Sequence, residues 1–229
     1  MASVKDVLNK LQSKAQPEQL KGMAKYGMAV EQRLGVSVPD MRKLAKEIGR
    51  DHKLALDLWK TGIADAKILA SMIDDPKMLD EKQMEEWVKD IDSWDVGDQV
   101  CMNLFEKSPL AWKKVDDWSM RDEEFVKRTA FGLLACLAWH DKKADDDDFL
   151  DLFYVFARGA MDERNAVKKA VSWALRNIGK RNLALNKAAV NEANRISLLN
   201  SKSARWIASD VTRELESEAV QKRLKKKQA

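Results

Sequence analysis

A short acidic segment that begins at Asp90 combines an indole with several carboxylates at a spacing suited to chemistry. Residues 90–98 read DIDSWDVGD, and Ser93 is a residue type that favours the N-cap position of a helix. Trp94 and Asp98 stand four residues apart, so on a helix they share one face. The functional interpretation is a carboxylate oriented beside an indole. The structural alternative is a helix start whose acidic residues merely complement the helix dipole.

Two later segments carry further candidate residues and resemble each other. They read VKRTAFGLL from Val126 and VKKAVSWAL from Val167, at a shift of 41 residues. That shift lies within the roughly 40–47 residues of HEAT-type helical repeats. Helices predicted to start near residues 64 and 94 look like the same element at a shorter spacing.

Aligning these helices places Asp98, Arg128 and Lys169 at equivalent positions, with Trp173 one turn beyond Lys169. We therefore expect a carboxylate, a guanidinium and two indoles to converge on one surface. Paired with Arg128, Asp98 is either half of a structural salt bridge or an oriented functional carboxylate.

The remaining sequence predicts helices to position these residues. Only nine glycines and four prolines occur in 229 residues, and 34% of the residues are charged, whereas average proteins contain about 7% glycine and 5% proline. We predict an all-α fold, a right-handed solenoid of HEAT-like repeats (an α-α superhelix), with a concave face suited to a long partner such as a nucleic-acid duplex. We expect one domain over residues 1–221 and a basic, disordered tail over residues 222–229.

Charge is distributed unevenly along the chain. Residues 1–161 carry 25 basic and 30 acidic side chains, whereas residues 162–229 carry 16 basic and 7 acidic ones. A net charge of −5 is thus followed by one of +9. Such an asymmetric basic end is typical of nucleic-acid binding, although the terminal lysines are also what a solvated chain end would contain.

Metal and cofactor chemistry is poorly supported by the sequence. The two histidines, His52 and His140, are too few for a histidine metal site or a hydrolase triad, and Cys101 and Cys136 lie in apolar segments typical of the core. The acidic run at residues 145–148 lacks the spacing of a calcium loop. We expect no metal and no cofactor.

The longest apolar stretch is ten residues, from Ala130 to Trp139, against about 20 for a membrane-spanning helix. We therefore expect a soluble monomer in the cytoplasm, associated with the nucleoid if the source is bacterial, and no membrane partner.

Four motifs in order resemble the AlkD-type DNA alkylation repair family, whose members are alkylpurine DNA glycosylases built from HEAT-like repeats. The motifs are AKY at 24–26 with LGVSVPDMR at 34–42, SWDVGD at 93–98, VKRTA at 126–130 and VKKAVSWALR at 167–176. The resemblance covers residues 24–180 and fades beyond Arg181.

This resemblance implies a C-shaped solenoid with duplex DNA, carrying alkylated bases, in its groove. It also implies that Trp94, Asp98, Arg128 and Trp173 match the active-site positions of the family. Contacts to DNA are expected from Tyr26, Lys127, Lys168, Lys169 and Arg176.

The expected reaction is hydrolysis of the N-glycosidic bond of purines alkylated at N3 or N7, such as 3-methyladenine and 7-methylguanine, which initiates base excision repair. These bases are cationic and leave readily, so Asp98 needs only to stabilise an oxocarbenium-like sugar and to activate water. Trp94 and Trp173 would flank the deoxyribose. Arg128 would orient Asp98 or hold a phosphate. The resemblance further implies that the lesion stays stacked in the duplex.

Two other classes of function remain open from the sequence. One is an inactive helical-repeat protein that binds damaged or branched DNA, and the other is a HEAT-type scaffold for protein partners. Retention of Trp94, Asp98, Arg128 and Trp173 favours the enzyme.

Overall fold

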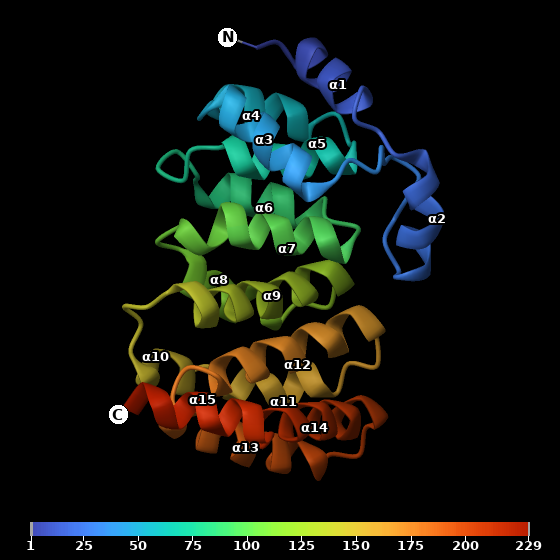
Figure 1. Ribbon diagram of the computed structural model, residues 1–229. Helices are drawn as coiled ribbons and strands as arrows, with labels where there is room; N and C mark the ends of the chain where they lie inside the picture. Colours follow the sequence, from blue (N-terminus) through green and yellow to red (C-terminus); the bar gives the residue numbers. More distant parts are fainter. Residues whose placement is uncertain (1, 229) are drawn as a thin grey trace. The chain divides into compact units, whose positions relative to one another are not determined.

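The computed structural model describes residues 2–228, and all regular secondary structure in that range is helical (Figure 1). The chain divides into two compact units, Met1–Pro109 (unit 1) and Leu110–Ala229 (unit 2). The helices of unit 1 are α1 (Val4–Gln12), α2 (Pro17–Lys25), α3 (Val38–Ile48), α4 (His52–Trp59), α5 (Ala64–Ile73), α6 (Glu81–Lys89), α7 (Trp94–Asn103) and the 3₁₀ helix η1 (Phe105–Lys107). The helices of unit 2 are α8 (Ala111–Ser119), α9 (Glu124–His140), α10 (Asp146–Leu150), α11 (Tyr154–Ala160), α12 (Asn165–Gly179), α13 (Leu183–Ser197), α14 (Lys202–Leu215) and α15 (Glu218–Gln228).

The helices follow a repeating order within each unit. In unit 1, α5 packs against α4 and α7, and in unit 2, α9 packs against α8 and α12, while α12 also packs against α11 and α14. Within each unit, the second helix of a pair therefore lies against the second helix of the next pair. These helices start at intervals of 30, 30, 41 and 37 residues, which confirms the predicted repeat and its shorter spacing early in the chain. They begin at Ala64, Trp94, Glu124, Asn165 and Lys202.

Polar contacts in unit 2 recur with nearly the same spacing. The Asn177 side-chain amide donates to the carbonyl of Ala135 at 3.1 Å, across 42 residues of sequence. The Ser172 hydroxyl donates to Asp210 Oδ2 at 2.6 Å, across 38 residues. Each contact joins a helix to its equivalent in the next repeat, so the repeats of unit 2 are connected by hydrogen bonds as well as by apolar packing.

Helix α9 forms the centre of the core in unit 2. It is buried continuously from Val126 to Ala138. Most of these residues are apolar or small, as expected for a helix covered all round, but Lys127 and Arg128 are buried among them. Cys136 on this helix and Cys101 on α7 are both fully buried, which agrees with the prediction that both belong to the core.

The C-terminal segment corrects one expectation. Residues 222–228, expected to be a disordered tail, belong to helix α15, and Ala229 lies outside the described residues. Leu224 is fully buried, and the Gln221 side-chain amide donates to Asn186 Oδ1 at 3.0 Å. An apolar anchor and a hydrogen bond therefore hold this basic helix on unit 2. The expectation of a single domain over residues 1–221 stays a prediction.

Two negative findings apply to the described part of the chain. No helix there combines the length and the hydropathy needed to cross a membrane. No group of three or more histidine, cysteine or acidic side chains is gathered there in a way that could hold a metal ion.

The close contact between Gly159 of α11 and the core of unit 2 predicts that adding one methyl group there will change the stability of the protein. A Cβ at Gly159 would collide with the Phe131 ring and lie 3.0 Å from Val171 Cγ2, and overpacking of this kind typically costs about 1–3 kcal/mol. We expect Gly159→Ala to lower the free energy of unfolding by that amount in urea titrations.

Gly22→Ala is the matched control. No atom lies within 4 Å of a Cβ at this position of α2, and alanine favours a helix by up to about 1 kcal/mol over glycine. Gly22→Ala should therefore be neutral or stabilising, whereas an equal loss in both variants would contradict the packing argument.

Candidate active site

The start of α7 is fixed by a buried serine. Ser93 occupies the N-cap position, as the sequence predicts, but its hydroxyl makes no capping bond to α7. It donates instead to Asp95 Oδ1 at 2.6 Å and accepts from the Ala29 amide at 3.2 Å. Ser93 is completely buried, so it attaches the beginning of α7 to the segment that follows α2.

An ion pair with Arg33 reinforces this attachment. The Arg33 guanidinium contacts both carboxylate oxygens of Asp95, at 2.6 and 3.0 Å, and its Nε donates to the Ala29 carbonyl at 2.8 Å. The Arg33 side chain is only 3% exposed, and two-pronged bonds between arginine and carboxylate are both strong and directional. Asp95 is therefore engaged in holding the turn.

Trp94 and Tyr26 lie together at the surface of unit 1. The Trp94 indole Nε1 donates to the Tyr26 carbonyl at 3.0 Å, and the Tyr26 side chain is 76% exposed. Trp94 and Asp98 are both partly exposed, whereas Val96 and Gly97 between them are buried. Helix α7 thus presents an indole and a carboxylate on one accessible face, one turn apart, as the sequence predicts.

In unit 2 the candidate residues of α9 are buried. Arg128 is 5% exposed and Lys127 is 6% exposed. The Lys127 ammonium lies 3.4 Å from Asp162 Oδ2 and 3.7 Å from Asp122 Oδ1. Contact with a DNA phosphate would require breaking a buried ion pair, so the placement of Lys127 does not support its predicted role in DNA binding.

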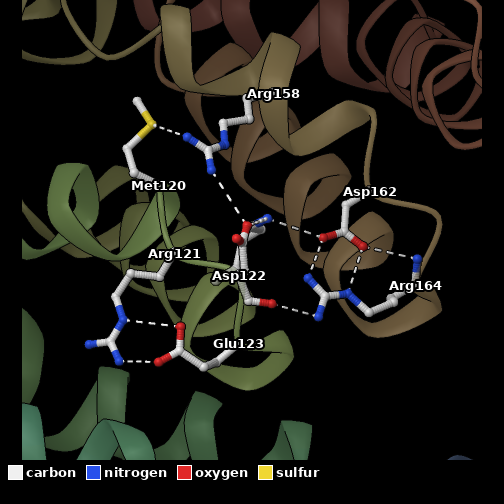
Figure 2. A network of polar contacts seen from close by, with 8 residues as sticks. Met120, Arg121, Asp122, Glu123, Arg158, Asp162 and Arg164 are labelled. Atoms are coloured by element: carbon white, nitrogen blue, oxygen red, sulfur yellow. Dashed lines mark hydrogen bonds and ion pairs between the residues drawn. The ribbon is translucent and has the colours of Figure 1, made fainter.

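Figure 2 shows the larger network to which this pair belongs. Arg164 donates from Nε and Nη2 to the two oxygens of Asp162, at 2.9 and 2.5 Å, and from Nη1 to the carbonyl of Asp122 at 2.8 Å. Arg164 is the N-cap residue of α12, and Asp122 directly precedes Glu123, the N-cap residue of α9. The network therefore joins the starts of the helices that carry Arg128 and Trp173.

The basic residues of α12 differ in how available their charges are. Lys169 is exposed and Lys168 is partly exposed, with its ammonium 4.9 Å from the centre of the Trp206 ring. Arg176 pairs with Glu214 and lies 3.4 Å from Asp210 Oδ2. Lys169 and Lys168 can therefore meet an anion directly, while the charge of Arg176 is balanced within the protein.

The structure thus brings Tyr26, Trp94 and Asp98 together in unit 1, and it places Arg128, Lys168, Lys169, Trp173 and Arg176 in unit 2. Convergence of the two groups on one surface stays a prediction. Sequence reasoning missed Arg33, which pairs with a residue 62 positions away. Its only signal was its place between the two segments of the first family-like motif, and no local pattern marks such a distant partner.

Comparison with known proteins defines first the class of fold and then the family. A solved structure described as "a new family of proteins related to the HEAT-like repeat DNA glycosylases with affinity for branched DNA structures" is similar with a TM-score of 0.77 at 21% identity, covering 93% of this chain and 95% of that one. The fold is therefore that of the HEAT-like repeat proteins. The crystal structure of an engineered protein aligns over 93% of this chain and 91% of that chain at 13% identity. Its TM-score of 0.45 is too low to support a conclusion about the fold.

The sequence profile of the DNA alkylation repair enzyme family matches residues 7–214. The chain therefore belongs to this family, which confirms the resemblance found in its motifs. No curated protein sequence matches significantly.

The ion pair at the start of α7 predicts a large effect on stability. Asp95→Ala would leave the buried Arg33 guanidinium without its carboxylate, and breaking a buried pair in this way typically costs about 3–5 kcal/mol. We expect a loss at the lower end of that range in urea unfolding, since Asp95 is 16% exposed. Asp92→Ala, at an exposed neighbouring carboxylate, should change stability by less than about 0.5 kcal/mol. Equal losses of stability in Asp95→Ala and Asp92→Ala would contradict the role of Asp95 in holding the start of α7.

The network of Figure 2 predicts a pH dependence. Burial alone would raise the pKa of Asp162, but hydrogen bonds from Arg164 and the charge of Lys127 outweigh it and hold the pKa below its usual 3.8. The Asp162 carboxylate therefore stabilises the folded state above about pH 4, and this contribution is lost as the pH falls through the folded-state pKa.

We expect the difference in unfolding free energy between the wild type and Asp162→Asn to be constant from about pH 7 to 5 and to shrink below about pH 4. Urea titrations at several pH values would measure it. A difference that persists unchanged at about pH 3 would show that the carboxylate charge is unimportant here.

Proposed function

We propose that the protein is a DNA glycosylase that hydrolyses the N-glycosidic bond of cationic N3- or N7-alkylated purines in duplex DNA, the first step of base excision repair. The observation that carries this proposal is the accessible face of α7, where Trp94 and Asp98 lie one turn apart beside exposed Tyr26. The neighbouring Asp95 is engaged with Arg33. Asp95 therefore has a structural role in holding the start of α7.

The proposed chemistry needs few groups. An alkylated purine already carries positive charge, so it can leave without a strong general acid, and the sugar develops oxocarbenium character as the bond breaks. The Asp98 carboxylate opposes that charge and accepts a proton from the attacking water. The Trp94 indole packs against the deoxyribose and adds a cation–π attraction of about 0.5–2 kcal/mol.

Rigid positioning supports the role of Trp94. Its indole N–H is held by the Tyr26 carbonyl, and the turn beneath it is held by Ser93 and Arg33. A group that is held in position before the reaction stabilises the transition state without reorganisation at the moment of reaction. The face of α7 that carries Trp94 and Asp98 would approach an alkylated base that stays stacked in the duplex from the side of its sugar.

The proposed roles in unit 2 follow from exposure. Lys169 and Lys168 would hold backbone phosphates, while Trp173, which is partly exposed on the same helix, would pack against a deoxyribose. The burial of Arg128 argues against the predicted role of its guanidinium in holding a phosphate.

A second candidate function is binding of branched DNA without catalysis. It is favoured by the solved relative described as having affinity for branched DNA structures. Binding to a four-way junction much tighter than to a linear duplex, with no release of alkylated base, would support this alternative.

The variant Asp98→Asn tests the proposed reaction. It preserves the shape of the side chain and removes the charge, so the barrier should rise by several kcal/mol. Each 1.36 kcal/mol is a factor of ten in rate, so release of 7-methylguanine should slow by at least about a hundredfold under single-turnover conditions.

Affinity for undamaged duplex should hold or rise slightly in Asp98→Asn, because a negative charge near the phosphates is removed. Asp92→Asn is the matched control, since it removes an exposed carboxylate six positions away, and its rate should equal that of the wild type. Wild-type rates in Asp98→Asn would exclude Asp98 as the catalytic carboxylate.

A further inference from the structure

A hollow of about 490 Å³ lies beside Trp173 within unit 2. Two indoles and four cationic side chains line it, and no carboxylate is among the described residues of its lining, although the chain contains 37 acidic residues. The aromatic and cationic side chains are Trp139, Trp173, Lys142, Lys180, Arg181 and Arg223.

The walls of the hollow are held by hydrogen bonds between repeats. The Arg181 guanidinium donates to the carbonyls of Ala138, Asp141 and Ala144 at 2.8–3.0 Å, which fixes the end of α9 and the turn after it. Lys180 pairs with Glu214 at 2.7 Å. These two cations shape the wall, so the charges best placed for a ligand are those of Lys142 and Arg223.

Arg223 reaches the hollow from the anchored helix α15. The neighbouring Leu224 is fully buried, so the helix that carries the exposed Arg223 is anchored, and no acidic partner of Arg223 is found within the described part of the chain. Lys142 donates to the carbonyl of Trp139, which leaves its positive charge unbalanced. The Trp139 indole is 55% exposed, an unusual position for so large an apolar side chain.

We propose that this hollow binds the sugar–phosphate backbone of one DNA strand. Arg223 and Lys142 contact backbone phosphates, and the Trp139 indole packs against a deoxyribose beside Trp173. The volume falls in the range of about 300–1,000 Å³ that is usual for ligand sites, and arginine suits phosphate because its fork of donors is planar. The proposal rests on the proposed function only in taking DNA as the ligand, and it makes the C-terminal helix part of the DNA interface.

The salt dependence of binding tests the role of Arg223. Affinity for an undamaged duplex is measured by fluorescence anisotropy at several salt concentrations for the wild type, Arg223→Ala and Lys225→Ala. Each lost phosphate contact should reduce the slope of log affinity against log salt by about 0.9. We expect that reduction in Arg223→Ala and none in Lys225→Ala, which removes the same charge two residues along α15, roughly on its opposite side.

A slope in Arg223→Ala equal to that of the wild type, or a reduction of equal size in both variants, would overturn the proposal. Excision of 7-methylguanine is scored with the same wild-type preparation. Wild-type excision with an unchanged Arg223→Ala slope would refute this inference alone. A reduced Arg223→Ala slope without wild-type excision would refute the glycosylase and leave the inference standing.

The indole contact has its own test. Quenching of tryptophan fluorescence is compared for a thymidine oligonucleotide and for one of the same length made of abasic tetrahydrofuran units. If the hollow recognises the backbone, the two oligonucleotides should quench the wild-type protein similarly. Both should quench Trp139→Ala less than they quench the control variant Tyr154→Ala. Tyr154 is a half-exposed aromatic residue outside the hollow. Quenching by the thymidine strand alone would show that a base occupies the hollow and would overturn the backbone assignment.

Discussion

The candidate site of unit 1 depends on one buried ion pair, between Arg33 and Asp95. A guanidinium that is 3% exposed must keep a carboxylate opposite it, because a buried charge without a partner is far costlier than the pair. This requirement holds the segment after α2 against the start of α7, and Ser93 adds a second link through the Ala29 amide. Trp94 reaches the Tyr26 carbonyl only because these two segments are held together. The partly exposed indole of Trp94 is thus positioned by a salt bridge in which it takes no part.

In unit 2, a different network of polar contacts holds the helix starts in position. Arg164 connects the turn before α12 to the turn before α9 through Asp162 and Asp122 (Figure 2). Helices of a repeat protein contact mainly their neighbours, so the position of each helix start has to be fixed by the adjacent repeat. Polar bonds across about 40 residues provide this, and they use cations that would otherwise be available to DNA. Net positive charge is therefore a poor guide to which basic residues bind phosphate.

Much of this structure could be predicted from the sequence, because helical periodicity and repeat spacing are local signals. They placed Trp94 and Asp98 on one face and identified the all-α repeat. Contacts between distant segments were not predictable in this way. The ion pair of Arg33 with Asp95 is one example. The burial of Lys127 is another, since a lysine is usually solvated. The order of residues 222–228 was not predicted, because their basic composition resembles a solvated chain end. Val220 and Leu224, both buried and four residues apart, were the signal for an anchored helix.

The family, the fold and the face of α7 together lead to one central claim, that the protein breaks N-glycosidic bonds rather than merely binding DNA. The most direct test is to incubate the wild-type protein with a duplex that contains a single 7-methylguanine and to analyse the small molecules released by mass spectrometry. The account predicts free 7-methylguanine in the supernatant and a matching abasic site in the strand. A stable complex with the duplex, from which no base is released, would contradict it.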